Sequence, residues 1–225
     1  MLVLKQVSYK YTNYKGIEDI NLSLEDGQIY ALLGANGSGK TTLLKCILGL
    51  LDCGSDDILW NDEKVKEQYD RVAYISADGS TISYLKVSEY ADFLITYYTS
   101  FDKKEYVRLL KEFHVEDNII SNLSKGEKVK VELAAGLAMQ AKLFIFDEPF
   151  TGLDIYTKDK VIKQIVAKLK EDVIMIISTH DVEEIETIAD QCIVLEEGKL
   201  VDKFRLDDLH ENGYELKEYL SKYHP

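Results

Sequence analysis

The pattern of apolar and polar positions predicts strands that alternate with helices along much of the chain. Residues 1–30 alternate the two kinds of side chain and end near an Asp26-Gly27 turn signal, which predicts short β segments. Compact apolar runs of strand length follow at Ile29–Leu33, Leu143–Phe146 and Val173–Ser178. Helical spacing covers Thr42–Leu51 and 161–169. Such alternation indicates a parallel α/β core.

The middle of the chain has a helical period. Apolar and aromatic residues recur at i, i+3, i+4, i+7 and i+8 over 90–98, and similar spacing returns over 106–113. With a further helix expected from Ser124, these segments predict a helical insertion over about residues 80–138. Their aromatic stripes fit packing between helices, and the alternative is a partner site. No linker or repeat is evident, so residues 1–225 are expected to form one domain that ends in a short helix or two.

Two of these helix starts carry the pattern of a capping box. Asp102 and Glu105 would cap one helix, and Ser124 and Glu127 would cap another. A capped helix start with a glycine in its first turn, here Gly126, is also a site for an anion. The spacing alone leaves both roles open for Ser124 and Gly126.

Composition and charge exclude several classes of function. The chain has 225 residues, 40 acidic against 27 basic, and a net charge of −13. Nucleic acid and anionic lipid both require a basic face, so membrane contact is expected through a protein partner. Apolar runs fall well short of the ~18–20 residues that span a bilayer, and the N-terminus lacks a signal peptide. Three cysteines without metal-site spacing are expected to be buried, reduced thiols of a soluble cytoplasmic protein: Cys46, Cys53 and Cys192.

The strongest chemical feature is a glycine-rich run between a predicted strand and a predicted helix. It reads GANGSGKTT and fits G-x-x-x-x-G-K-[ST]. Glycines let backbone amides curl around a phosphate, and the helix N-terminus adds positive charge. Lys40 would reach the β- and γ-phosphates, and the Thr41 hydroxyl would ligate Mg²⁺. The predicted nucleotide-binding residues are Gly34, Asn36, Gly37, Ser38, Gly39, Lys40, Thr41 and Thr42.

A pair of carboxylates ends a later apolar strand. Leu143–Phe146 is followed directly by Asp147 and Glu148. Phosphoryl transfer on a phosphate-binding loop needs a carboxylate at a neighbouring strand end to hold Mg²⁺. Side chains of adjacent strand residues diverge, so the two acids are expected to differ in role. Asp147 would bind the metal, and Glu148 would act as the general base for the attacking water.

A histidine follows the third apolar strand. His180 lies just after Val173–Ser178, where open α/β sheets place their ligands. It is expected to donate a hydrogen bond to the γ-phosphate, and the alternative is a structural histidine.

With these elements in order, the sequence resembles the nucleotide-binding domain of the ATP-binding-cassette (ABC) family over nearly its whole length. Gly34–Thr42 matches the Walker A motif and Leu143–Glu148 matches Walker B. Leu123–Glu127 resembles the LSGGQ signature, Gly152-Leu153-Asp154 the D-loop, and His180 the switch histidine. The resemblance implies a P-loop NTPase fold of the α/β class, with a parallel-sheet core, an N-terminal antiparallel β subdomain and a helical insertion. It also implies Mg²⁺-dependent ATP hydrolysis.

The resemblance assigns further residues to the nucleotide. Tyr11 stands where the family places an aromatic ring that stacks on adenine, with Tyr9 and Tyr14 as neighbouring alternatives. In this family two such domains pair head to tail, and each ATP lies between one Walker A motif and the partner's signature. Ser124 and Gly126 would therefore contact the γ-phosphate held by the second subunit. The pair would be a homodimer or would include a paralogous ABC subunit.

Two motifs depart from the family pattern. In the signature, Lys125 replaces the first glycine and Glu127 replaces the glutamine, while the second glycine is kept. Family members usually carry a glutamine that touches Mg²⁺ or the attacking water in a loop that also contacts the membrane subunit. Ala77 stands at that position here, and Asp78 is a substitute one residue later.

The LSKG-type signature and the compact length are most similar to ATPase subunits of bacterial ABC-2-type exporters. This similarity implies a subunit attached peripherally to the cytoplasmic membrane through a separately encoded integral-membrane partner, and no nucleic-acid partner. Two other hypotheses remain. One is a soluble regulatory ABC ATPase that is not coupled to transport, and the other is an ATP sensor that hydrolyses little, which the missing glutamine suggests.

Overall fold

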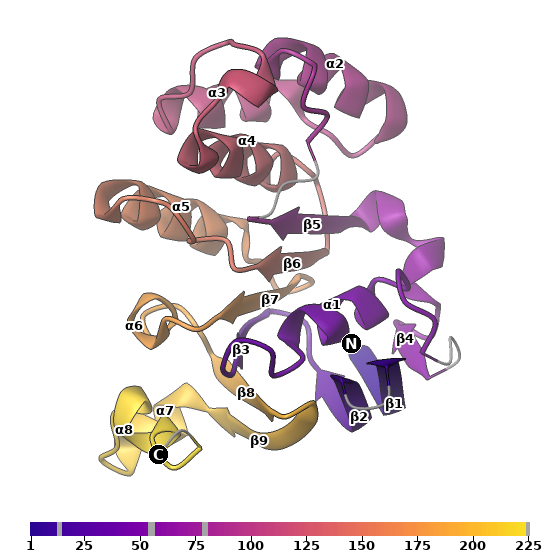
Figure 1. The fold of residues 1–225 in the computed structure, drawn as a ribbon, viewed down its shortest axis with the longest axis vertical. Coiled ribbons are helices and arrows are strands. Elements are labelled where there is room, and N and C mark those ends of the chain that lie inside the picture. Colours follow the sequence, from indigo (N-terminus) through magenta and orange to yellow (C-terminus); the bar gives the residue numbers. More distant parts are fainter. Residues whose placement is uncertain (13–14, 54–56, 78–80, 224–225) are drawn as a thin grey trace. The chain divides into compact units, whose positions relative to one another are not determined.

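The computed structural model describes the chain in four stretches, residues 1–12, 15–53, 57–77 and 81–223. Tyr14 and Asp78, named above as alternatives, lie outside the described residues. The chain divides into two compact units, and Figure 1 labels their helices and strands. The first unit comprises Met1–Tyr69 with Glu171–Pro225, and the second comprises Asp70–Lys170. Across the described stretches, no helix combines the length and apolar character that a membrane span requires.

The first unit contains an antiparallel sheet in the order β2-β1-β4. Its strands are β1 Leu2–Thr12, β2 Lys15–Leu24 and β4 Ile58–Trp60. β1 and β2 are longer than the short segments expected, because bulges absorb the breaks in the alternation. Gln6 and Asp19 adopt positive φ angles of 51° and 49° at these bulges. Their amides donate to Asn21 Oδ1 and Ser8 Oγ, both at 2.9 Å.

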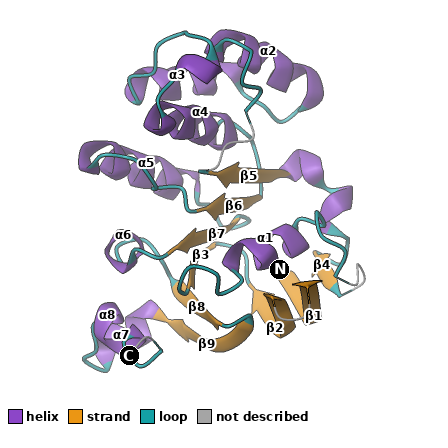
Figure 2. Cartoon of the chain, in the orientation of Figure 1, coloured by secondary structure: helices purple, strands orange, loops and turns teal. Residues whose placement is uncertain are grey.

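A mixed sheet forms the rest of the first unit. The strand order is β7-β3-β8-β9, in which β3 is parallel to β7 and β8, and β9 is antiparallel to β8 (Figure 2). The strands are β3 Gln28–Leu33, β7 Ile174–Thr179, β8 Gln191–Glu196 and β9 Lys199–Arg205. The helices are α1 Lys40–Ile47, α6 Val182–Ile185, α7 Leu206–Glu211 and α8 Leu216–Leu220, with a 3₁₀ turn at Val65–Glu67. The predicted strands at 29–33 and 173–178 are confirmed, and both are buried, which explains their unbroken apolar runs.

The helix predicted over Thr42–Leu51 begins and ends earlier than expected. α1 ends at Ile47, and Gly49 adopts a φ angle of 67°. The Gly49 amide donates to Cys46 O at 2.9 Å and the Leu50 amide donates to Lys45 O at 2.9 Å. This left-handed glycine closes the helix, although the apolar spacing continues beyond it.

The second unit contains two parallel strands and the helices of the middle segment. Its strands are β5 Val72–Ser76 and β6 Leu143–Asp147, which pair in parallel. Its helices are α2 Val87–Tyr97, α3 Lys103–Glu112, α4 Lys125–Leu137 and α5 Ile155–Lys168, with a 3₁₀ turn at Ile120–Asn122. A further 3₁₀ turn, Tyr69–Arg71, includes Tyr69 of the first unit and the first two residues of the second. The helices predicted from the 90–98 and 106–113 stripes are confirmed. Tyr90, Leu94 and Tyr106 are buried, so these stripe positions pack within the unit.

The capping box predicted at Asp102 and Glu105 forms only in part. The Asp102 side chain accepts a hydrogen bond from the Glu105 amide at 3.1 Å and so caps α3. The reciprocal bond is absent from the contacts of these described residues, because the Asp102 amide donates to Ala138 O at 2.9 Å. Glu105 is therefore available for contacts with other side chains.

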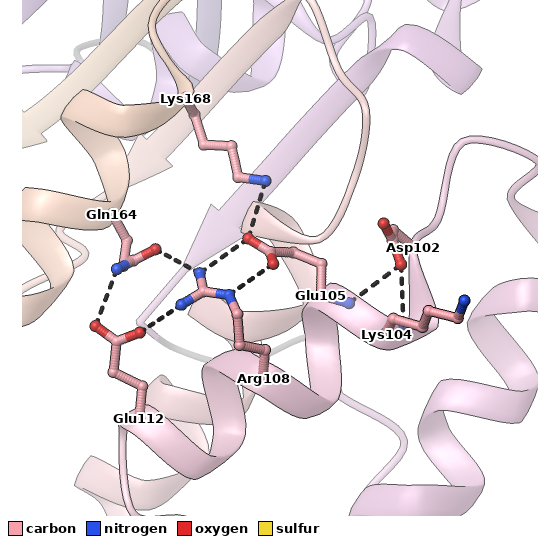
Figure 3. Close-up of polar contacts among 7 residues, drawn as sticks. All are labelled: Asp102, Lys104, Glu105, Arg108, Glu112, Gln164 and Lys168. Carbon is pink, nitrogen blue, oxygen red and sulfur yellow. Dashed lines mark hydrogen bonds and ion pairs between the residues drawn. The ribbon is translucent and has the colours of Figure 1, made fainter.

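Those contacts form a polar cluster between α3 and α5 (Figure 3). Arg108 donates to Glu105 through Nε at 2.7 Å and Nη2 at 2.9 Å, and to Glu112 through Nη1 at 2.7 Å. On α5, Gln164 accepts from Arg108 at 2.6 Å and donates to Glu112 at 2.9 Å. Lys168 of α5 pairs with Glu105 at 3.2 Å. We call these residues the Arg108 cluster.

The Arg108 cluster predicts an acid-sensitive contribution to stability. Hydrogen bonds from Arg108 lower the pKa of Glu105 to about 2 against the opposing effect of burial, and Lys168 adds to the lowering. A carboxyl whose folded pKa lies below its unfolded value of about 4.3 stabilises the fold above that value and loses the effect as pH falls. We expect Glu105→Gln to lower the free energy of unfolding by about 1 kcal/mol at pH 7 and by less at pH 3.5. Urea unfolding at both pH values measures the difference, Glu116→Gln is the matched exposed control, and a pH-independent difference would contradict the assignment.

Candidate functional site

The glycine-rich run leaves β3 and wraps into the first turn of α1. Gly39 is the N-cap residue of α1 and has a φ angle of 106°, a left-handed conformation that side chains disfavour. A Cβ atom on Gly34 would lie 2.3 Å from Leu195 O and 2.5 Å from Ser38 Oγ. The loop therefore requires glycine at Gly39 for its backbone conformation and at Gly34 for close packing.

Lys40 is buried within this loop. Its Nζ atom donates to Gly34 O at 2.7 Å and to Ala35 O at 3.3 Å, and the residue is 6% exposed. A buried ammonium group is stabilised by hydrogen-bond acceptors and by anions such as phosphate. Ser38 Oγ is also buried, and no hydrogen-bond partner for it is found in the described part of the chain. The first-turn amides of a helix add further donors, so the loop fits the phosphate groups of a nucleotide.

The remaining loop residues differ in exposure. Asn36, Gly37 and Thr41 are exposed, whereas Thr42 is buried beneath the loop. Nothing lies within 4 Å of a Cβ built on Gly37. The exposed Thr41 hydroxyl lies at the helix start, as a Mg²⁺ ligand beside a bound phosphate would, while burial of Thr42 indicates a packing role.

His180 lies beside the loop by strand register. Leu33 of β3 pairs with Thr179 of β7 in parallel, so Gly34 and His180 leave neighbouring strands at the same level. The His180 side chain is exposed. Asp181 follows and accepts a hydrogen bond from the Glu183 amide at 3.2 Å, which caps α6. The first unit thus brings the lysine of the loop and the histidine to one edge of its sheet.

Tyr11 lies near the end of β1 with its ring in solvent. It is 51% exposed, and its ring packs edge-on against Tyr9 at a centroid distance of 4.8 Å. Tyr9 is partly buried. Of these two described tyrosines, Tyr11 presents the larger face for stacking.

The two acids of the second unit have different environments. Asp147 is 6% exposed, and its Oδ2 atom accepts a hydrogen bond from the Tyr74 hydroxyl at 3.4 Å. Glu148 is partly exposed and has a φ angle of 52°. A left-handed, non-glycine residue is strained, and such strain is typical of functional sites. Asp147 fits the buried, polar role of a metal-binding carboxylate, and Glu148 fits a role in contact with water.

Ala77 follows the strand that pairs with β6. Ser76 is opposite Asp147, and the Ala77 amide donates to Asp147 O at 3.2 Å. The Ala77 methyl group cannot ligate a metal or orient water. Tyr74, on the same strand, supplies a polar contact to Asp147 that the sequence pattern does not reveal.

The signature segment begins α4. Ser124 Oγ accepts from the Glu127 amide at 3.3 Å, and Glu127 accepts from the Ser124 amide at 2.9 Å and the Ser124 hydroxyl at 2.7 Å, which confirms the capping box. The Ser124 hydroxyl hydrogen bond lowers the pKa of the Glu127 carboxyl. The cap therefore holds a charged carboxylate at the start of the helix at neutral pH.

The signature glycine touches the D-loop segment within the second unit. A Cβ atom on Gly126 would lie 2.9 Å from Gly152 O. The D-loop then ends at Asp154, which caps α5 by accepting from the Thr157 amide at 3.0 Å and its hydroxyl at 2.6 Å. The first turn of α4 is thus in contact with the D-loop segment that precedes α5, and sequence spacing gave no sign of this contact.

Gly126→Ala is expected to destabilise the second unit and to slow ATP hydrolysis. Helix propensity alone would favour alanine by up to ~1 kcal/mol, but overpacking against a carbonyl costs about 1–3 kcal/mol. We therefore expect a net loss of up to about 2 kcal/mol, measured by urea unfolding. Lys125→Ala, at the exposed neighbouring position, is the control. Stabilisation by Gly126→Ala would show that the contact with Gly152 relaxes without cost.

Known proteins resemble this chain in sequence and in fold. The family model described as ABC transporter matches residues 17–151. The SkfA peptide export ATP-binding protein SkfE of Bacillus subtilis (strain 168) is 32% identical over 231 residues, covering 98% of this chain and 95% of that protein. A solved ATP-binding subunit of an ABC transporter aligns with a TM-score of 0.86 at 27% identity and covers 100% of both chains. CbiO1 from Clostridium perfringens, part of the transporter complex cbiONQ, aligns with a TM-score of 0.75 at 25% identity over 98% of this chain and 93% of that one.

The similarity to known proteins and the geometry of the site support the same family assignment. The family match extends from the antiparallel sheet through the phosphate loop to the start of the D-loop. The α/β fold expected from the sequence, with its antiparallel N-terminal sheet, is confirmed. The chain belongs to the ABC transporter family, as an ATP-binding subunit that hydrolyses ATP with Mg²⁺.

Proposed function

We propose that this chain is the ATPase subunit of an exporter and works as a pair of cassettes on an integral-membrane partner. The observation that carries the ATPase role is the phosphate loop, in which buried Lys40 and Ser38 hold polar groups that suit phosphate. The similarity to SkfE over 98% of the chain supports export, since that relative is a peptide export protein. A peptide-like substrate is the class that this likeness favours.

In this proposal MgATP is bound by Lys40, Thr41 and Asp147. Lys40 contacts the β- and γ-phosphates together with the amides of the loop. Thr41 and Asp147 hold Mg²⁺, which neutralises phosphate charge when it is bound. The buried position of Asp147 and the exposed position of Thr41 support this division.

Further residues act on the reacting phosphate, on the attacking water and on the adenine ring. Glu148 accepts a proton from the attacking water, and His180 donates a hydrogen bond to the γ-phosphate. Tyr11 stacks on adenine, which its exposed ring supports. Ser124 and Gly126 contact the γ-phosphate bound by the second cassette, and the exposure of Ser124 at the start of α4 supports this role.

In this proposal residues 1–225 form one nucleotide-binding domain, which contains a helical subdomain at about residues 80–138. The pair is a homodimer or includes a paralogous subunit. It attaches to the cytoplasmic face of the membrane through a separately encoded subunit. The net charge of −13 supports attachment through protein rather than through anionic lipid, and cbiO1 is part of a multi-subunit complex.

Capture from native membranes tests this proposal. Tagged Glu148→Gln protein is incubated with membranes and ATP, detergent-extracted, and its co-purifying proteins are identified by mass spectrometry. We expect one integral-membrane protein in amounts comparable to the bait. Inverted vesicles that contain this membrane protein and the wild-type ATPase chain should show ATP-dependent uptake of peptide. Recovery only in the aqueous fraction would favour the regulatory alternative, and uptake by right-side-out vesicles would show import.

A further inference from the structure

A cavity opens at the far end of α1 from the phosphate loop. Its volume is about 360 Å³, and it lies between the last turn of α1, the segment that follows it, β4 and the neighbouring 3₁₀ turn. Cys46 and Cys53 both line it, with Ile58 and Val65 on the other sides. Small polar molecules can therefore approach both thiols through this cavity.

The two thiols are in contact with each other. Cys46, in the last turn of α1, and Cys53 are hydrogen-bonded side chain to side chain. The Cys53 Sγ atom also lies 3.5 Å from Leu51 O, to which it donates. The hydrogen bond from Cys46 lowers the pKa of Cys53, and the same bond together with burial raises the pKa of Cys46. Cys53 is thus the better nucleophile of the two.

We propose that Cys46 and Cys53 form a reversible disulfide when the protein meets a peroxide, and that this cross-link weakens nucleotide binding at the opposite end of α1. The Cys53 thiolate attacks one peroxide oxygen, the O–O bond breaks, and the leaving hydroxide takes a proton to give water. Cys53 is then a sulfenic acid. The Cys46 sulfur attacks the Cys53 sulfur, the S–O bond breaks, and the hydroxide leaves with the Cys46 proton as a second water. Both sulfurs are oxidised and the peroxide is reduced.

The cross-link can act on the phosphate loop because α1 is short and closely packed. A disulfide bond of about 2.05 Å is far shorter than a contact between hydrogen-bonded thiols, so the cross-link draws the last turn of α1 and the segment that carries Cys53 together. Leu43, Leu44 and Ile47 of α1 are buried, and close-packed interiors transmit such shifts. Lys40, in the first turn of the same eight-residue helix, moves with it.

The remaining cysteine serves as an internal comparison. Cys192 lies in β8 with 0% exposure, and burial raises its pKa to about 12. It is therefore almost entirely protonated at neutral pH and unreactive toward peroxide. Oxidation of the folded chain is expected to be selective for the Cys46–Cys53 pair.

Peptide mapping and ATP titration test the proposal. Reduced full-length protein is treated with hydrogen peroxide, quenched, alkylated under denaturing conditions, digested and analysed by mass spectrometry. We expect a Cys46–Cys53 linked peptide, alkylated Cys192, and a Kd for ATP raised at least threefold, restored by dithiothreitol. Cys53→Ser and Cys46→Ala should each abolish the change in Kd, and Cys192→Ala should retain it.

Each other result is decisive. A pair that remains reduced, or Cys53 that stops at sulfenic or sulfinic acid, would overturn the disulfide. A complete cross-link with an unchanged Kd would overturn its control of nucleotide binding. The mapping does not rest on the nucleotide role of the loop, so a protein that cross-links but binds no ATP in either state would instead refute that role.

Discussion

Glu148→Gln is expected to lower steady-state ATP hydrolysis by about 10²–10⁴-fold, the usual contribution of a general base. Glutamine has nearly the same shape as glutamate but cannot accept the proton of the attacking water. The substituted side chain keeps the strained backbone at Glu148, whose φ angle is 52°, so folding should be unaffected. ATP binding is proposed to depend on the loop around Lys40 and should therefore persist. An ATP-bound pair of cassettes should then accumulate because its release requires hydrolysis.

Two measurements together check this expectation. Phosphate release gives the rate, and size-exclusion chromatography with light scattering at saturating ATP gives the oligomeric state. Glu116→Gln, at an exposed position on the segment after α3, is the matched control and should leave both unchanged. A Glu148→Gln protein that stays monomeric and still turns over would show that another group accepts the proton.

The alanine at position 77, where the family usually has a glutamine, affects the size of the loss expected for Glu148→Gln. Ala77 follows the strand paired with β6, and its amide donates to Asp147 O at 3.2 Å. The backbone here is thus hydrogen-bonded to the strand that ends at Asp147, although the side chain of Ala77 offers no ligand. In the proposed roles Glu148 alone activates the water. The side chain at position 77 should therefore not compensate for the loss of ATP hydrolysis in Glu148→Gln.

Much of the fold could be predicted because its signals are local. β3 and β7 are buried on both faces, so they form unbroken apolar runs. The start of α4 carries its own capping box in Ser124 and Glu127. Both patterns act over a few residues, which a sequence shows directly.

The errors have separate causes, of which one is a distant group that competes with a local pattern. The Asp102 box fails in part because the Asp102 amide donates to Ala138, 36 positions along the chain. α1 ends early because the left-handed Gly49 closes it while the apolar spacing continues. β9 was not predicted, because its residues are exposed or half-buried and many are charged, so it lacks the apolar run of a core strand. β8 was not predicted either, although its four central residues are buried.

The candidate site divides in the same way. The glycine-rich loop and the acid pair follow from residue types at fixed spacing. The contact of Tyr74 with Asp147 depends on the register of β5 and β6, and the contact of Gly126 with Gly152 depends on how α4 and α5 pack. The left-handed backbone of Glu148 also leaves no trace in residue type, since glutamate seldom adopts it.

Lys40→Met is expected to weaken ATP binding by about 10–150-fold. Hydrogen bonds to charged groups contribute about 1.5–3 kcal/mol, and each 1.4 kcal/mol is about tenfold in affinity. Methionine keeps most of the apolar stem that packs below the loop and removes the ammonium group that contacts Gly34 O at 2.7 Å. The substitution loses the hydrogen bonds of Lys40 to Gly34 O and Ala35 O and also removes the cost of burying a charge, so the free energy of unfolding should change by less than about 1 kcal/mol.

Titration with a fluorescent ATP analogue measures the loss, and urea unfolding measures stability. Lys45→Met, in the last turn of the same helix and partly exposed, is the matched control and should retain affinity within about twofold, since a 0.4 kcal/mol change is about that size. The comparison separates a local phosphate contact from general loss of positive charge near α1. Equal losses for Lys40→Met and Lys45→Met would indicate charge alone, whereas retained affinity in Lys40→Met would place the phosphates away from the loop that buries this lysine.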